Sequence, residues 1–91
     1  MINFGLDDLC DWLEESGFYS LEPGRNGILA AYRRIKWLVE LAPFTHGIGA
    51  ILTNIEAESN LSSILYSDLE NLLADVKKFD ADPSEWGRQF K

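Results

Sequence analysis

Hydrophobic residues near the N-terminus recur at the spacing of an α-helix. At about 100° per residue they fall on one stripe, and acidic residues occupy the opposite arc. This pattern predicts an amphipathic helix over residues 5–16, and Gly17 is suited to end it as the residue after the C-cap. The stripe consists of Leu6, Leu9, Cys10 and Leu13.

The next apolar segment, residues 27–41, has hydrophobic residues on almost every side when it is drawn as a helix. A helix of this kind usually lies at the centre of a bundle, so the pattern predicts a central second helix that ends before Pro43. The preceding stretch SLEPGRN, residues 20–26, contains Pro-Gly and predicts a turn.

A third helix is predicted from Thr45 or His46 to Glu58, because its isoleucines and leucine recur at helical spacing. Gly47 and Gly49 weaken its first turn. A β-strand is the other interpretation of GIGAILTNI, but it needs a pairing partner that the helical reading of the chain does not supply. Residues 59–63 are expected to be a connector, with one helical turn through Tyr66.

Capping signals predict the C-terminal helices. Ser67 and Glu70 have the spacing of a capping box, which predicts a helix over residues 68–79. Asp82 followed by Pro83 predicts another helix start. The sequence therefore predicts an all-α fold, a compact bundle of four to five short helices, with residues 1–91 forming a single helical domain.

The composition restricts the function classes. The chain has 91 residues, a net charge of −7, and a single cysteine that rules out an internal disulfide. The acidic balance argues against direct nucleic-acid binding and favours partners with basic surfaces. No apolar run approaches the roughly 18 residues of a membrane span, and no basic leader follows Met1, so we expect a cytoplasmic protein with no membrane contact.

No set of residues predicts catalysis, a metal site or a cofactor. His46 is the single histidine, and Cys10 lies on the apolar stripe, where an inert buried thiol is the usual outcome. The segment DADPS at residues 80–84 begins like a calcium loop but lacks its glycine and final glutamate. Gly47 and Gly49 lack the third glycine of a dinucleotide-binding fingerprint. We therefore expect a protein that is not an enzyme and binds no cofactor.

The remaining candidate is the acidic face of the first helix. Its carboxylates repel one another at i,i+4 spacing, which destabilises an isolated helix. One interpretation is a docking surface for a basic partner, with Trp12 as an aromatic anchor. The alternatives are a merely solvated face, or acids neutralised inside the fold by Arg33 and Arg34. The predicted partner-binding residues are Asp7, Asp8, Asp11, Trp12, Glu14 and Glu15.

No stretch carries a motif that identifies a family. In size, acidity and expected helical make-up, the chain is similar to small inhibitors such as anti-CRISPR and toxin-immunity proteins. That resemblance implies an inhibitor or adaptor that docks on a partner protein and blocks a basic nucleic-acid-binding surface. The alternative is a self-associating helical subunit, a homodimer that buries apolar residues left over from the core. The residues expected in that interface are Trp37, Tyr66, Trp86 and Phe90.

Overall fold

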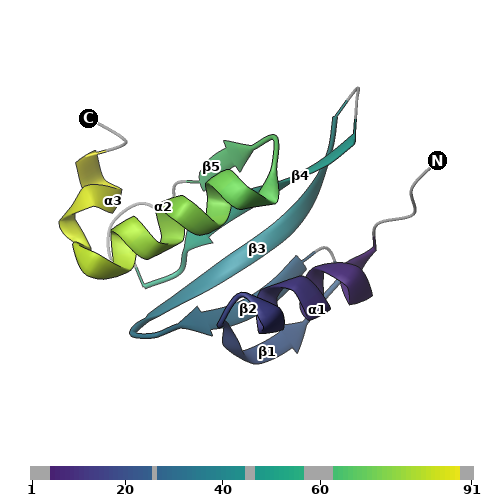
Figure 1. The fold of residues 1–91 in the computed structure, drawn as a ribbon, viewed down its shortest axis with the longest axis horizontal. Coiled ribbons are helices and arrows are strands. Elements are labelled where there is room, and N and C mark those ends of the chain that lie inside the picture. Colours follow the sequence, from purple (N-terminus) through teal and green to yellow (C-terminus); the bar gives the residue numbers. More distant parts are fainter. Residues whose placement is uncertain (1–4, 26, 45–46, 57–62, 89–91) are drawn as a thin grey trace.

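The computed structural model describes residues 5–25, 27–44, 47–56 and 63–88. They form a helix, an antiparallel sheet, and two further helices (Figure 1). The helices are α1 (Leu6–Glu15), α2 (Leu69–Ala81) and α3 (Ser84–Arg88). The strands are β1 (Tyr19–Pro23), β2 (Gly27–Tyr32), β3 (Ile35–Phe44), β4 (Gly47–Asn54) and β5 (Ser63–Tyr66). The expectation of an all-α bundle is therefore wrong.

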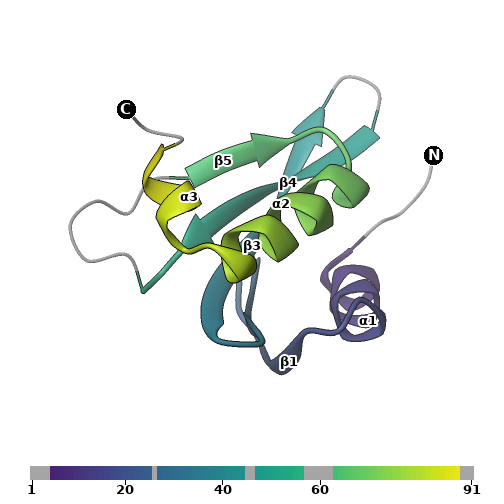
Figure 2. The same ribbon diagram turned by 60° about the vertical axis from the view of Figure 1, so that its left-hand side comes forward.

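The sheet has five strands in the order in which they occur along the chain, and each pairs antiparallel with the next. The helices lie against one face of it. In Figure 1, α1 lies over β1 and β2, and α2 lies over β4 and β5. Figure 2, turned by 60°, shows the same layer of helices beside the curved sheet. The described part of the molecule is thus two layers, with helices on one side only.

The segment predicted as a central second helix is a β-hairpin. Tyr32 pairs with Ile35, and between them Arg33 adopts the left-handed region at φ 53° that tight hairpin turns use. Trp37 and Val39 are fully buried on the helix side, whereas Leu38 between them faces the other way. Both faces of these strands carry apolar residues, so the sequence lacks the alternation of polar and apolar residues that is typical of a strand. The segment therefore resembles a helix with apolar residues on every side.

The predicted third helix is also wrong, because β4 occupies most of it. Its pairing partners are β3, which lies mostly in the segment predicted as a second helix, and β5, which lies in the expected connector and helical turn. Residues 57–62 lie outside the described residues, as does His46. The predicted turn over residues 20–26 is partly strand β1, and the chain reverses where Gly24 donates its N–H to the carbonyl of Gly27, at 2.8 Å.

The helices were predicted correctly where their end signals are local. α1 ends as expected: Gly17 has φ 104°, and the N–H of Phe18 donates to the carbonyl of Leu13 at 3.0 Å. α2 begins one residue later than predicted. Its N-cap is Asp68, which accepts from the N–H of Asn71 at 2.8 Å, and so Ser67 is not the cap. Asp82 accepts from the N–H of Ser84 at the start of α3.

One hydrophobic cluster joins both layers. Trp37, Phe79 and Trp86 pack with ring centroids 5.3–5.9 Å apart. Tyr66 is 7% exposed in the same cluster. The expectation that Trp37, Tyr66 and Trp86 are left over for self-association is therefore wrong, and Phe90 lies outside the described residues. Within the described ranges, no helix is long and apolar enough to cross a membrane.

Candidate functional site

The outward side of α1 carries the predicted acidic face. Leu9 and Leu13 are fully buried against the sheet, which fixes the rotation of the helix about its axis. Helical periodicity then directs the intervening carboxylates to solvent. We use the term acidic face for these five exposed residues: Asp7, Asp8, Asp11, Glu14 and Glu15.

Two residues of the acidic face stabilise the start of α1. The N–H of Gly5 donates to the Asp8 carboxylate at 3.0 Å, so Asp8 is partly used in starting the helix. Asp7 lies in the same first turn, where the positive end of the helix dipole favours a carboxylate. Asp11, Glu14 and Glu15 lie beyond that turn, and neither capping nor the helix dipole stabilises their charges.

No cation of the described residues lies within ion-pair distance of the acidic face. The ion pairs in this part of the chain join Arg33 to Asp80, and Lys78 and Arg88 to Glu85. Each of these carboxylates belongs to the C-terminal helices or their connection. Among the described residues, therefore, no side-chain cation offsets the repulsion within the acidic face.

Arg33 and Arg34 are engaged elsewhere, at the buried carboxylate of Asp80. The backbone N–H of Arg34 donates to Asp80 Oδ1 at 3.3 Å, and its guanidinium donates to the Asp80 carbonyl. Arg33 Nη1 lies 3.9 Å from Asp80 Oδ2. The interpretation in which these arginines neutralise the acids of the first helix is therefore wrong.

Trp12 lies at the edge of the acidic face and is only partly exposed. Its ring packs against the hydrophobic cluster, together with Leu6 and Cys10. A side chain in this position contributes to the core and also presents part of an aromatic surface to solvent. The structure thus brings all six predicted residues onto one helix, with the tryptophan less accessible than the acids.

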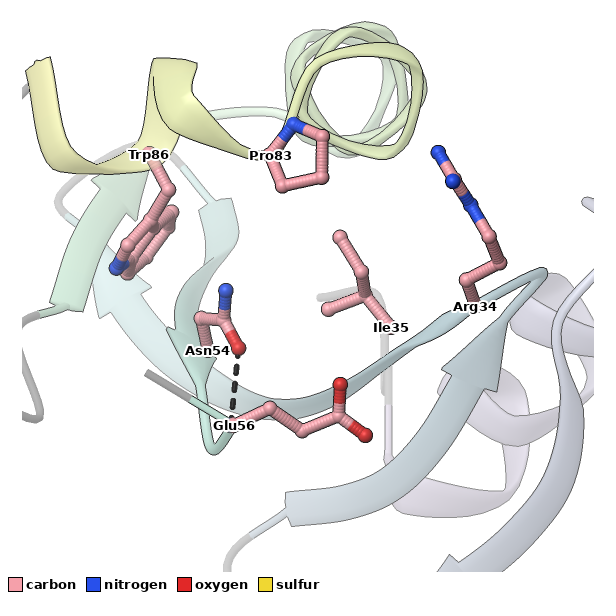
Figure 3. Close-up of a pocket in the computed structure, with 6 residues that line it drawn as sticks. All are labelled: Arg34, Ile35, Asn54, Glu56, Pro83 and Trp86. Atoms are coloured by element: carbon pink, nitrogen blue, oxygen red, sulfur yellow. Dashed lines mark hydrogen bonds between the residues drawn. The ribbon is translucent and has the colours of Figure 1, made fainter. Parts of the chain in front are cut away.

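A pocket of about 400 Å³ lies where α3 meets the ends of β3 and β4 (Figure 3). Ile35, Pro83 and Trp86 form its apolar walls, and Figure 3 shows Trp86 and Pro83 on one side of it. The polar lining residues are Arg34, Asn54 and Glu56. Two of them are already engaged, since Asn54 Oδ1 accepts from the N–H of Glu56 at 3.0 Å and Arg34 binds Asp80. The lining holds no nucleophile paired with a base, so it supports no reaction by itself.

Two ionisable groups outside the acidic face, Tyr66 and Asp82, have structural roles. Tyr66 donates its hydroxyl hydrogen to Asp75 at 2.8 Å. Burial, and secondly this hydrogen bond, raises the pKa of the Tyr66 hydroxyl above its usual range. The hydrogen bond from Ser84 lowers the pKa of the Asp82 carboxyl. Across the described ranges, no three histidine, cysteine, aspartate or glutamate side chains gather as a metal site.

Sequence reasoning missed two features. One is the buried Asp80, which the sequence singled out only as the first residue of a failed calcium loop. The other is the side of the sheet that faces away from the helices, because the hydrophobic pattern of β2, β3 and β4 predicts helices. The alternation of Trp37 and Val39 with Lys36 and Leu38 was the available signal for that second face.

Comparisons with protein-family models, with curated proteins and with solved structures find no match to this chain.

Proposed function

We propose that this protein is a non-enzymatic interaction module that binds a partner protein with a basic surface through the acidic face of α1. The observation that supports the proposal most is the lack of any ion pair between this face and the described cations. Like charges at i,i+4 spacing cost the helix a few tenths of a kcal/mol per pair. A basic partner would convert that repulsion into attraction.

The charge distribution favours a partner that otherwise binds nucleic acid. The acidic face places five carboxylates along one side of a ten-residue helix. A row of negative charges can compete with phosphates for the same lysines and arginines. The protein would then act as an inhibitor that blocks a basic nucleic-acid-binding surface.

The proposal is tested by capture from a lysate of the native host with a matched pair of variants. The first variant carries Asp11→Asn, Glu14→Gln and Glu15→Gln, which spares the residues near the helix start. The control carries Glu22→Gln, Glu56→Gln and Glu70→Gln, which changes the net charge equally at exposed positions outside α1. We expect a basic partner that the wild type and the control retain and that the α1 variant loses.

Binding kinetics of that partner provide the second part of the test. Loss of the acidic face should mainly slow association, and the difference from the wild type should shrink as salt screens the charges over a Debye length of about 8 Å. Displacement of the partner's nucleic acid would support the inhibitor role. Equal capture by both variants, or a partner with an acidic surface, would contradict the proposed docking face.

A further inference from the structure

The sheet has a second face that no described helix covers. Side chains that alternate with the buried ones point to this side, and strand pairing brings Leu29 beside Leu38, and Ile51 beside Leu65. Leu29, Leu38 and Ile51 are partly exposed, and Leu65 is 58% exposed. We call this set of four residues the outer apolar patch. Thr53, opposite Leu38, and Glu40, opposite Ile51, lie between the two pairs. Exposed aliphatic side chains gathered on one face are a feature that interaction surfaces share.

We propose that the outer apolar patch is the contact surface between two copies of this chain. The order of side chains on the central strand β3 favours a second copy as the partner. On the outer side it presents Lys36, Leu38 and Glu40 in succession, a cation and an anion at equal distances from a leucine. Four residues of strand separate the two charges by about 13 Å, too far for them to pair within one chain. Among the described ion pairs, neither side chain has a partner.

A two-fold axis in the plane of the interface satisfies both charges at once. If the axis passes Leu38 at right angles to β3, the strands of the two copies run antiparallel and Leu38 meets Leu38 of the other copy. Lys36 of each copy then lies opposite Glu40 of the other. Such an isologous contact forms each ion pair twice. A parallel arrangement would instead place lysine against lysine.

The size of the face fits a reversible dimer. Five strands about 4.8 Å apart and about 20 Å long present roughly 500 Å² per copy. The total of about 1,000 Å² is at the lower end of specific interfaces, which corresponds to a weak association. We therefore expect dissociation constants in the micromolar range.

The net charge of −7 does not oppose this arrangement strongly. The acidic face of α1 lies on the helical layer, on the far side of the sheet from the outer apolar patch. Stacked layers lie about 10 Å apart, so the acidic faces of two copies would be separated by about 30 Å, well beyond the Debye length at physiological salt. The patch itself is flanked by the opposite charges of Lys36 and Glu40.

Sedimentation velocity on the full chain, from about 1 to 300 µM, tests this proposal with charge-reversal variants. We expect the wild type to dimerise, and Lys36→Glu or Glu40→Lys alone to weaken the dimer at least tenfold. The double variant with both reversals should restore it, because each new pair has the same geometry with its signs exchanged. Circular dichroism would verify that each variant folds. A further variant, Leu65→Ser, should weaken the dimer without changing the charge.

Three results would overturn the proposal. The first is a wild type that stays monomeric over the whole concentration range. That result would leave the patch to a different partner protein. The second is a dimer that both single reversals leave unchanged, which would place the contact elsewhere. The third is a double variant that fails to recover, which would exclude the antiparallel two-fold arrangement.

Discussion

At the scale of single residues, the polar groups placed in the interior serve the fold. Asp80 is 3% exposed and accepts the backbone N–H of Arg34, so a carboxylate from α2 secures the turn between β2 and β3. Tyr66 donates to Asp75, which joins β5 to the same helix. These contacts connect residues of the two layers that hydrophobic packing alone would not orient.

The Tyr66 hydroxyl gives stability a dependence on alkaline pH. Its pKa is raised in the folded state, so above about pH 10, where an unfolded tyrosine ionises, the native state keeps a proton that the unfolded chain loses. The stabilisation is complete below about pH 10 and is lost as pH rises toward the folded pKa.

Urea unfolding between pH 8 and pH 11 measures this effect in the wild type and in Tyr66→Phe. Above pH 10 the free energy of unfolding of the wild type should fall more steeply, by up to about 1.4 kcal/mol per pH unit for one proton. The variant retains the other tyrosines and serves as the baseline. If the free energy of unfolding of the two proteins depended on pH in the same way, burial of Tyr66 would not affect its ionisation.

At the scale of elements, local signals predicted the helices, and the strands depended on distant pairing. The end of α1 follows from Gly17, and the start of α3 from Asp82 and Pro83, all within a few residues. The strands β2 and β3 gave no such signal, because their turn is Arg33-Arg34 instead of the usual Asn-Gly. Their apolar residues on both faces concealed the two-residue alternation that a one-sided sheet normally shows.

The cap of α2 is a case where the pattern was right and the residue was wrong. Asp68 accepts from both the backbone N–H and the side-chain amide of Asn71, each at 2.8 Å. We expect Asp68→Ala to lower the free energy of unfolding by about 1 kcal/mol, and Ser67→Ala, one residue earlier, to change it little. Thermal unfolding of the two variants side by side checks this. If Ser67→Ala lowered the free energy of unfolding more than Asp68→Ala, Ser67 would be the N-cap and the assignment of Asp68 would be wrong.

At the scale of the whole molecule, the acidic face and the outer apolar patch belong to different layers. The acidic face belongs to α1, which Figures 1 and 2 show on one side of the sheet. The residues of the outer apolar patch alternate along the strands with those buried on that side, and so they lie on the opposite face of the sheet. A dimer through the patch would display two acidic faces on its outside, each free for a basic partner. The two proposed contacts are therefore compatible and can be tested separately.

The sequence could predict the acidic face but not that Arg33 and Arg34 lie away from it. The residues of the face follow from the helical period of α1, a local property. Whether Arg33 and Arg34 reach them depends on the β2–β3 turn, which directs both arginines to Asp80. That turn is a product of sheet pairing, so a helical interpretation could not place it.

The most direct test of the account is the free energy of unfolding of the variant with Asp11→Asn, Glu14→Gln and Glu15→Gln at low salt. If these acids serve no contact within the fold, the variant should equal the wild type or exceed it by up to about 1 kcal/mol, because repulsion at i,i+4 and i,i+3 spacing is removed. Added salt should reduce the gain. A loss of more than about 1 kcal/mol would show that the carboxylates are paired inside the fold, and would contradict a face reserved for a partner.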